Sequence, residues 1–320
     1  MKFDAQHFHC GALSGRVRMD APAGLAIEPL FLGGNAGASW ADMRNSGSIR
    51  FEATDVEAPA SPVPEICRDF GDSHVQCASN ACATVRILPD HAPPARQRLP
   101  AALAFAFAHQ WARLGHLCVH GALLRVSGEG VLVLGIRAAG KSVLSASALM
   151  AGGQLITDDH VIVGIRDGHL VGERIRSFFS LRASWASDAL TDGSGEWKKD
   201  RTGRRAFLRV SEEDPRFPEH TRIDRLWILS RPREERRESS SISALSHAEA
   251  YGAIVTAIQP LLLGAEFPHE SAKIHSLIRR MISGIPAARI ETGQDIVLSP
   301  QRSWRKLLEA SMRATGRSGF

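Results

Sequence analysis

Apolar and polar positions alternate over several short stretches of the chain. This alternation predicts β-strands, because successive side chains of a strand point to opposite faces. In the first part of the chain it covers residues 48–53 and 83–88. A glycine-rich turn cluster at residues 33–37 precedes the first stretch, and a proline-rich one at residues 58–64 separates the two. Residues 118–126 and 131–134 are apolar segments on either side of a turn at residues 127–130, which predicts a hairpin. We therefore expect a small β-rich N-terminal section followed by more regular strands and helices.

The second part of the chain alternates strand and helix signals. Predicted helices cover residues 101–114, 141–150, 248–263, 271–282 and 303–314. Residues 154–165 and 223–230 are rich in β-branched and apolar side chains and predict strands. Residues 193–205 are polar, basic and contain glycine, a composition typical of a mobile loop. Strands alternating with helices indicate an α/β domain, which we assign to residues 99–320, with the β-rich section over residues 1–98.

The composition narrows the class of protein. The chain has 320 residues, of which 44% are hydrophobic and 23% charged, as in globular proteins. No apolar run approaches the roughly 20 residues that cross a bilayer, and the N-terminus lacks the apolar core of a secretory signal, so we expect a cytoplasmic protein without a membrane partner. The formal charge is +5, but only one tyrosine is present, so we do not expect a nucleic-acid partner. The five cysteines form no CxxC pair and predict free thiols.

A glycine loop precedes the helix predicted over residues 141–150. Its residues are Gly135, Ile136, Arg137, Ala138, Ala139, Gly140, Lys141 and Ser142, with Val143 next, and they fill every fixed position of the pattern GxxxxGK[ST]. In such a loop, backbone N–H groups and the helix dipole face the β-phosphate of a nucleotide. Lys141 is expected to reach the β- and γ-phosphates, and the Ser142 hydroxyl to bind Mg²⁺. The pattern therefore predicts a site for ATP and Mg²⁺ and favours a kinase.

Asp158 and Asp159 lie near the centre of the strand predicted over residues 154–165. An acidic pair is unfavourable in an ordinary strand, whose neighbouring side chains face opposite sides. This strand follows the helix of the glycine loop, where a carboxylate can reach a nucleotide-bound metal. One carboxylate would then hold the metal, and the other would activate a substrate hydroxyl. The alternative is a polar turn between two short strands.

Four segments together resemble one known family. They are residues 120–124, which begin with His120, residues 130–135, the glycine loop, and residues 155–161 with the aspartate pair. A single histidine on a strand is usually an ordinary packed or exposed side chain. The order and spacing of these segments, however, are similar to those of the HPr kinase/phosphorylase family. That family has an HG-x-L-x strand, a GVL strand, a GxSGxGKS loop and an L-x-x-DD-x-V strand.

The resemblance implies an atypical serine kinase whose P-loop core has a fold like phosphoenolpyruvate carboxykinase. By position, Asp159 resembles the base that accepts the proton of the substrate hydroxyl, and Asp158 resembles its partner near Mg²⁺. His120 resembles the family's active-site histidine, while Lys141 and Ser142 keep their phosphate and metal roles. The family is commonly oligomeric, so the resemblance is compatible with a homo-oligomer.

The chain also departs from the bifunctional enzymes of this family. Val143 follows the GKS triplet where those enzymes usually carry glutamate, and their signature with a further metal-binding glutamate has no clear equivalent. Glu173 is a candidate for that carboxylate. Residues 177–182, with Trp185 and Asp188 after them, instead resemble divergent members. Those members include lasso-peptide kinases that phosphorylate a precursor's C-terminal serine, so the expected partner is a peptide or protein bearing an acceptor serine.

Several functions fit these residues. An ATP-dependent serine kinase, including one that acts on an HPr-type protein, needs a cation on the transferred phosphoryl group, and Arg204 and Arg205 are candidates for it. The alternative for these arginines is a solvated charge run. A nucleotide-hydrolysing regulator would use the same loop without an acceptor. A pseudo-enzyme would retain the loop and bind a peptide without turnover.

Overall fold

The computed structural model of the chain describes residues 2–4, 7–10, 13–20, 47–53, 66–69, 73–77, 82–87, 105, 108, 111–112, 115–136, 138–174, 178–182, 196–199, 205–209, 214–230, 238–262 and 271–314. The chain divides into two compact units. Unit 1 is Met1–Cys118 with Leu261–Ile274, and unit 2 is Val119–Pro260 with His275–Phe320. Unit 2 contains the glycine loop and the aspartate pair. The division expected after residue 98 stays a prediction.

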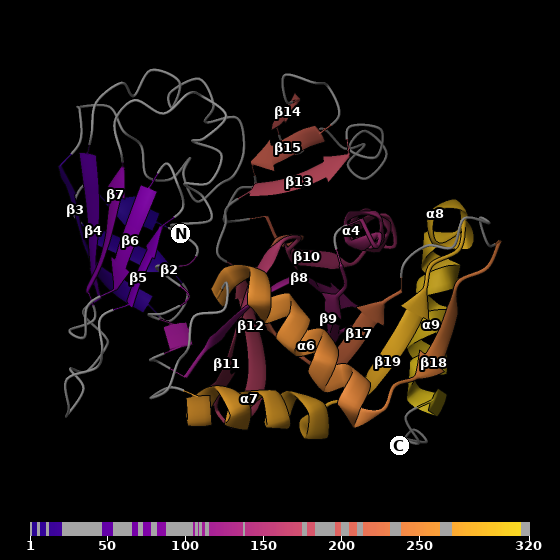
Figure 1. Cartoon of the computed structure of the whole chain (residues 1–320). Helices are drawn as coiled ribbons and strands as arrows, with labels where there is room; N and C mark the ends of the chain where they lie inside the picture. The colour runs from indigo at the N-terminus through magenta and orange to yellow at the C-terminus, as the bar shows by residue number, and fades with distance from the viewer. Residues whose placement is uncertain are drawn as a thin grey trace. The chain divides into compact units, whose positions relative to one another are not determined.

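Unit 1 contains a seven-stranded antiparallel sheet (Figure 1). Its strands are β1 (Lys2–Asp4), β2 (His7–Cys10), β3 (Leu13–Asp20), β4 (Gly47–Ala53), β5 (Ile66–Asp69), β6 (Ser73–Cys77) and β7 (Cys82–Ile87). Their order in the sheet is β1-β2-β3-β4-β7-β6-β5. The alternating stretches at residues 48–53 and 83–88 form β4 and β7, which confirms both strand predictions. Of the helix predicted over residues 101–114, Phe105, Ala108, Trp111 and Ala112 are helical and buried, and the other residues lie outside the described ranges.

Unit 2 is a mixed α/β structure with a central nine-stranded sheet. Its strands are β8 (Leu117–Val126), β9 (Glu129–Leu134), β10 (Gln154–Thr157), β11 (His160–Arg166), β12 (His169–Arg174), β16 (His220–Arg222), β17 (Arg225–Leu229), β18 (Ser241–Ala244) and β19 (Ala287–Glu291). The order is β16-β12-β11-β8-β9-β17-β19-β18, and β10 pairs with β8. Strand β17 is parallel to β9 and β19, whereas β8 and β9 form the predicted antiparallel hairpin.

One continuous strand was predicted over residues 154–165. That prediction was wrong, because the strand is interrupted. Strand β10 ends at Thr157 and β11 begins at His160, with Asp158 and Asp159 between them. The pairing of β10 with β8 also shifts register just before the interruption. Two adjacent carboxylates are poor strand residues, and a break releases them from the alternation that a continuous strand would impose. The geometry is therefore that of the alternative, a polar turn between two short strands.

A second correction concerns residues 193–205, which were predicted to form a mobile loop. Part of this segment belongs to a three-stranded sheet of order β13-β15-β14, whose strands are β13 (Phe178–Arg182), β14 (Glu196–Lys199) and β15 (Arg205–Arg209). Arg205 opposes Arg182 in the antiparallel pairing of β15 with β13. Strand β14 forms by pairing with β15, and such pairing between separate segments cannot be seen in local composition.

The bounds of five helices are described: α4 (Lys141–Met150), α6 (His247–Leu262), α7 (Ser271–Gly284), α8 (Asp295–Leu298) and α9 (Pro300–Ala314). Four of them match the predicted helices over residues 141–150, 248–263, 271–282 and 303–314 to within a few residues. Among the residues that the structure describes, no helix combines the length and the apolar character needed to cross a membrane.

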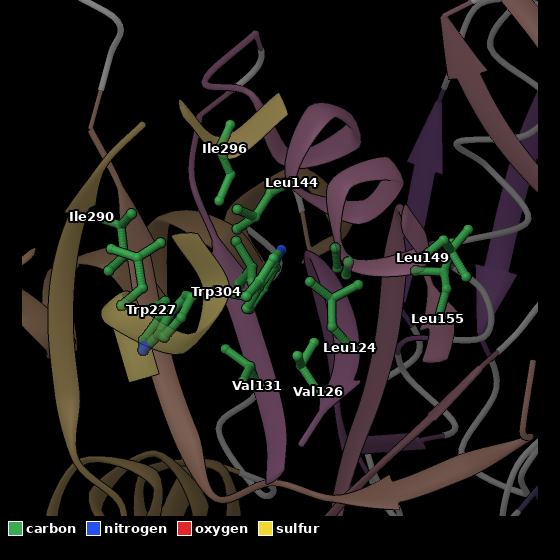
Figure 2. Packing of buried hydrophobic residues seen from close by; sticks show 14 of the residues in the cluster. Leu124, Val126, Val131, Leu144, Leu149, Leu155, Trp227, Ile290, Ile296 and Trp304 are labelled. Carbon is green, nitrogen blue, oxygen red and sulfur yellow. The ribbon is translucent and has the colours of Figure 1, made fainter. Parts of the chain in front are cut away.

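The main core of unit 2 lies between the sheet and helices α4, α8 and α9 (Figure 2). Alternate residues of β8 and β9 enter it, among them Leu124 and Val131. The rings of Trp227, on β17, and Trp304, on α9, stack with centroids 5.2 Å apart and planes 17° apart. The indole N–H of Trp304 donates to Ser147 Oγ on α4 at 3.0 Å. The C-terminal helix thereby holds α4, the helix that follows the glycine loop, against the sheet.

The intervening residues of β8 and β9 face the opposite side of the sheet. Leu123 and Leu132 are fully buried there, although neither belongs to the core around Trp304. Helices α6 and α7 cross in front of the strands of this sheet (Figure 1), and each buries one apolar stripe. Ile254 and Met281 lie in these stripes and are fully buried. Both faces of the central strands are therefore buried from solvent, which explains why the sequences of these strands are nearly continuously apolar.

Removing the Trp304 side chain will destabilise unit 2. We expect Trp304→Ala to lower the free energy of unfolding by about 3–5 kcal/mol, because it leaves a cavity beside Trp227 and removes the hydrogen bond to Ser147. Arg302→Ala, at an exposed position of the same helix, should change it by less than about 0.5 kcal/mol. Urea denaturation followed by circular dichroism measures both. Equal effects of the two substitutions would contradict this account of the core.

Helix α6 begins with a capping box. Glu249 N–H donates to Ser246 Oγ at 3.3 Å, and Ser246 N–H donates to the Glu249 carboxylate at 3.0 Å. Arg289 of β19 donates to the same carboxylate at 2.5 Å. These hydrogen bonds, chiefly those from Ser246, lower the pKa of Glu249 from its ordinary 4.5 to about 2. The ionised carboxylate therefore stabilises the folded state.

The capping box predicts a pH-dependent difference between wild type and Glu249→Gln. Because the folded-state pKa is lowered, the charge of Glu249 contributes stability above pH 4.5, and this contribution is lost as the pH falls toward about 2. Glu249→Gln should be less stable than wild type at neutral pH, and the difference should shrink across that range. Urea midpoints at a series of pH values measure it. Glu309→Gln, at an exposed position of α9, serves as the control and should show no such trend.

Candidate active site

The glycine loop connects the end of β9 at Leu134 to the start of α4 at Lys141. Two of its residues have positive φ angles, Ala138 at 65° and Gly140 at 107°. A φ of 107° is strained for any residue with a Cβ atom, which accounts for the fixed glycine at this position. Gly140 is also the N-cap of α4, and its carbonyl accepts the first helical hydrogen bond, from Leu144 N–H at 3.0 Å. The strand, loop and helix thus follow one another as predicted.

Three residues tie the loop to the core. Ala139 is buried in the core, and Val143 packs against it from the first turn of α4. A Cβ atom at Gly135 would lie 3.0 Å from Leu229 Cβ, so the junction of β9 and the loop has little room for a side chain. These contacts fix the path of the loop backbone without using the groups that face solvent.

Other residues of the loop are more exposed to solvent. Ile136 and Ala138 are exposed, and Ser142, in the first turn of α4, is half-buried. Arg137 lies outside the described residues, so its part in nucleotide binding stays a prediction. The first turn of α4 carries no acidic residue, which leaves the positive end of its dipole available to an anion.

Lys141 is the first residue of α4, and only 7% of it is exposed. Its ammonium group donates to the carbonyl oxygens of Gly135 at 2.5 Å and Ile136 at 3.2 Å, so it folds over its own loop. Burial lowers the pKa of Lys141, and the negative charge of Asp159 acts against this by raising it.

Asp159 lies between two histidines. Its Oδ1 is 3.1 Å from His120 Nδ1, and its Oδ2 is 3.0 Å from His160 Nδ1. The backbone supports this arrangement, because Gly121 N–H on β8 donates to the Asp159 carbonyl at 2.9 Å. Asp159 and His120 are each 29% exposed and His160 19%, so solvent and a substrate can reach all three. The predicted pair of Asp159 and His120 is thus brought together by adjacent strands.

His160 is a residue of this site that sequence reasoning missed. It directly follows the aspartate pair, and its ring lies 5.5 Å from that of His120, centroid to centroid, in an edge-to-face arrangement. The Thr157 hydroxyl donates to the His160 carbonyl at 2.9 Å and closes the turn between β10 and β11. A continuous strand would have pointed His160 and Asp159 to opposite faces, so only the interruption explains their contact.

Asp158 directly follows β10 and is 6% exposed. Its burial distinguishes it from Asp159, which is nearly a third exposed. The two neighbouring carboxylates therefore have different environments, as expected if they have different roles. The binding of Mg²⁺ by Ser142 and Asp158 stays a prediction.

The structure says less about the remaining predicted site residues, which are Glu173, Arg204 and Arg205. Glu173 lies on β12 and forms an ion pair with Arg166 at 2.5 Å, so its carboxylate already has a cationic partner. Arg204 lies outside the described residues. Arg205 begins β15, and only its backbone pairing is described. The proposed contact of these arginines with phosphate stays a prediction.

A segment after β19 also lies beside the loop. A Cβ atom at Gly140 would be 3.7 Å from Thr292 Oγ1. The turn that contains Thr292 is held by hydrogen bonds from Gly293 N–H to Ser240 Oγ at 2.9 Å and from Ser240 Oγ to Asp295 at 2.7 Å. Thr292 therefore places its hydroxyl group beside Gly140, at the edge of the loop. No motif marked it, because it is distant from the loop in the sequence.

Comparisons with known proteins add little to this geometry. No protein-family model matches the chain, and no curated protein sequence matches it. A solved structure to which the chain is similar is that of the HPr(Ser) kinase/phosphatase from Coxiella burnetii. The identity is 14%, the TM-score is 0.29, and the match covers 61% of this chain and 88% of that chain. With so low a TM-score, the function has to be argued from the side chains themselves.

The buried lysine leads to a prediction about nucleotide binding. We expect Lys141→Met to weaken the binding of ATP by roughly 10- to 100-fold, the effect of losing a charged hydrogen bond of about 1.5–3 kcal/mol. The fold should be retained, because methionine fills similar space and no charge has to be buried. Isothermal titration calorimetry with MgATP measures the affinity. Lys306→Met, at an exposed position of α9, is the matched control, and an equal loss there would remove Lys141 from the site.

Proposed function

We propose that the protein is an ATP-dependent kinase that transfers the γ-phosphoryl group to a serine-type hydroxyl of a peptide or protein. The observation that carries the proposal is that Lys141 is buried over the glycine loop while Asp159 presents a partly exposed carboxylate between two histidines. A lysine for the phosphates and a base for the acceptor are the two groups that this reaction requires from the protein. The motif resemblance to the HPr kinase/phosphorylase family supports the same class of reaction.

The glycine loop would hold the triphosphate. Lys141 now donates to two neutral carbonyl oxygens, and phosphate oxygens would offer it stronger, charge-assisted hydrogen bonds. Ser142 and Asp158 would supply oxygen ligands, the donors that Mg²⁺ prefers. Mg²⁺ held there would offset the negative charge of the phosphates. Thr292 is a further donor for the same oxygens.

Asp159 would act on the acceptor. It accepts the proton of the serine hydroxyl while the serine oxygen bonds to the γ-phosphorus and the bond to the β,γ-bridging oxygen breaks, which releases ADP. His120 and His160 hold the two carboxylate oxygens and so limit the orientations of the base. Lys141 stabilises the charge that develops on the phosphoryl oxygens.

A peptide acceptor is supported by two observations. The resemblance of residues 177–182 to divergent members of the family favours a tailoring kinase, with the C-terminal serine of a lasso-peptide precursor as the acceptor to try first. Asp159 is also partly exposed, which leaves it accessible to a side chain from another molecule. An HPr-type protein presents the same hydroxyl chemistry and is the second acceptor to try.

The test is incubation of the purified protein with MgATP and a precursor peptide ending in serine, followed by intact mass measurement of the peptide. We expect the gain of one phosphate. Asp159→Asn should slow the transfer by roughly 10²- to 10⁴-fold, the usual contribution of a general base. Asp167→Asn is the matched control, because Asp167 is exposed and has a φ of 51°, a conformation that asparagine also adopts readily.

The outcomes separate the candidate functions. ATP hydrolysis that depends on Lys141 and Asp159, without transfer to peptide or HPr-type protein, would favour the nucleotide-hydrolysing regulator. Nucleotide binding without any turnover would favour the pseudo-enzyme. Equal transfer rates for Asp159→Asn and Asp167→Asn would refute the role of Asp159 as the base.

A further inference from the structure

We propose that His120, Asp159 and His160 together form a binding site for a divalent transition-metal ion of the Zn²⁺ class, distinct from the predicted Mg²⁺ site. Within the described part of the chain, the ligand atoms of these three side chains lie within 4.8 Å of one another. Two imidazoles and one carboxylate are a set of protein ligands found at zinc sites that keep a position open.

The separations of the ligand atoms fit such an ion. The Nδ1 atoms of His120 and His160 are 3.1 and 3.0 Å from the two oxygens of Asp159. Two ligands at about 2.0–2.2 Å from a tetrahedral Zn²⁺ lie roughly 3.3 Å apart, close to these two separations, and side-chain rotation would bring both imidazole nitrogens to an ion bound by one Asp159 oxygen. The imidazoles would bind the ion in their neutral form, through nitrogen lone pairs.

The sheet positions the three ligands before an ion arrives. His120 lies on β8, and the hydrogen bond from Gly121 N–H to the Asp159 carbonyl ties that strand to the turn. The Thr157 hydroxyl donates to the carbonyl of His160 and fixes the other side of the turn. A site built on paired strands loses little entropy when it binds an ion. All three side chains are partly exposed, so an ion can enter and a water molecule can supply a fourth ligand.

Ligand chemistry separates this site from the nucleotide's metal. Imidazole nitrogen favours Zn²⁺, Cu²⁺, Ni²⁺ and Fe²⁺, whereas Mg²⁺ favours oxygen ligands. The predicted Mg²⁺ ligands, Ser142 and Asp158, offer only oxygen. Millimolar Mg²⁺ should therefore not displace Zn²⁺ from the histidines.

Occupation of this site has a consequence that rests on the proposed function. An aspartate whose oxygen is bound to a metal ion is a much weaker base toward the proton of a serine hydroxyl, because the positive ion stabilises the unprotonated carboxylate. The positive ion would also repel the ammonium group of Lys141, on which the charge of Asp159 now acts. Zn²⁺ would therefore inhibit phosphoryl transfer while leaving the glycine loop intact.

The first experiment measures metal binding alone. The full chain, freed of metal and without nucleotide, competes for Zn²⁺ with a chromophoric chelator. We expect wild type to bind Zn²⁺, and His160→Gln to bind it at least roughly tenfold more weakly, since even a lost outer-shell partner costs about 10- to 100-fold. Asp159→Asn, which is nearly isosteric, should also weaken binding. His169→Gln, at an exposed position of β12, is the matched control and should bind as wild type does.

Co²⁺ gives an independent spectroscopic readout. Its visible absorption reports the geometry of its ligands, so wild type should show a band that His160→Gln and Asp159→Asn lack and His169→Gln keeps. Zn²⁺ affinities that are equal in wild type, His160→Gln and Asp159→Asn would overturn the proposal, because the ion would then lie elsewhere. Failure of wild type to bind Zn²⁺ at all would also overturn it.

A second experiment distinguishes failure of the proposed metal site from failure of the proposed kinase function. Phosphoryl transfer is measured at increasing Zn²⁺ with constant MgATP, and the rate of each variant is compared with its own rate in the absence of Zn²⁺. The inhibition midpoint should rise at least roughly tenfold in His160→Gln, in parallel with its weaker binding, but not in His169→Gln. Zn²⁺ binding without transfer to any acceptor would refute the kinase and leave the metal site standing. Transfer without Zn²⁺ binding would refute the site and leave the kinase standing.

Discussion

Backbone pairing along β8 is interrupted at Asp158 and Asp159, and the geometry of the candidate site depends on that interruption. Strands β10 and β11 would otherwise place successive side chains on opposite faces of the sheet. The break instead lets Asp159 contact His120 across the strands and His160 next to it in the chain. One backbone hydrogen bond, from Gly121 N–H to the Asp159 carbonyl, holds the turn against β8.

The second requirement is that the glycine loop stay fixed relative to this turn. Helix α4 provides this, because Trp304 of α9 packs on the core and donates a hydrogen bond to Ser147 of α4. At the other end of the helix, the left-handed Gly140 fixes the loop backbone, and Lys141 is buried over it. Lys141 is thereby held at the start of α4, and the hydrogen bond from Gly121 N–H holds the turn that carries Asp159.

These two constraints give the site two kinds of ligand chemistry. The loop side offers N–H groups, an ammonium group and hydroxyl groups, which suit phosphates and a hard cation. The turn side offers imidazole nitrogen on both oxygens of one carboxylate, which suits either proton transfer or a softer metal ion. Asp159 belongs to both proposals, in which a proton and a metal ion would compete for the same carboxylate.

The sequence by itself determined the local features. The pattern GxxxxGKS located the loop, α4 and Lys141, and alternation located β4 and β7. Apolar segments on either side of a turn located β8 and β9, and the resemblance selected His120 and the role of Asp159. These features depend on neighbouring residues, whose spacing is visible in the chain. Only the tertiary structure decided where the strand over residues 154–165 breaks, that Glu196–Lys199 is a strand, and that His160 and Thr292 lie beside the predicted residues. Strand pairing and packing join segments that are distant in the sequence, and no local pattern records which segments will meet.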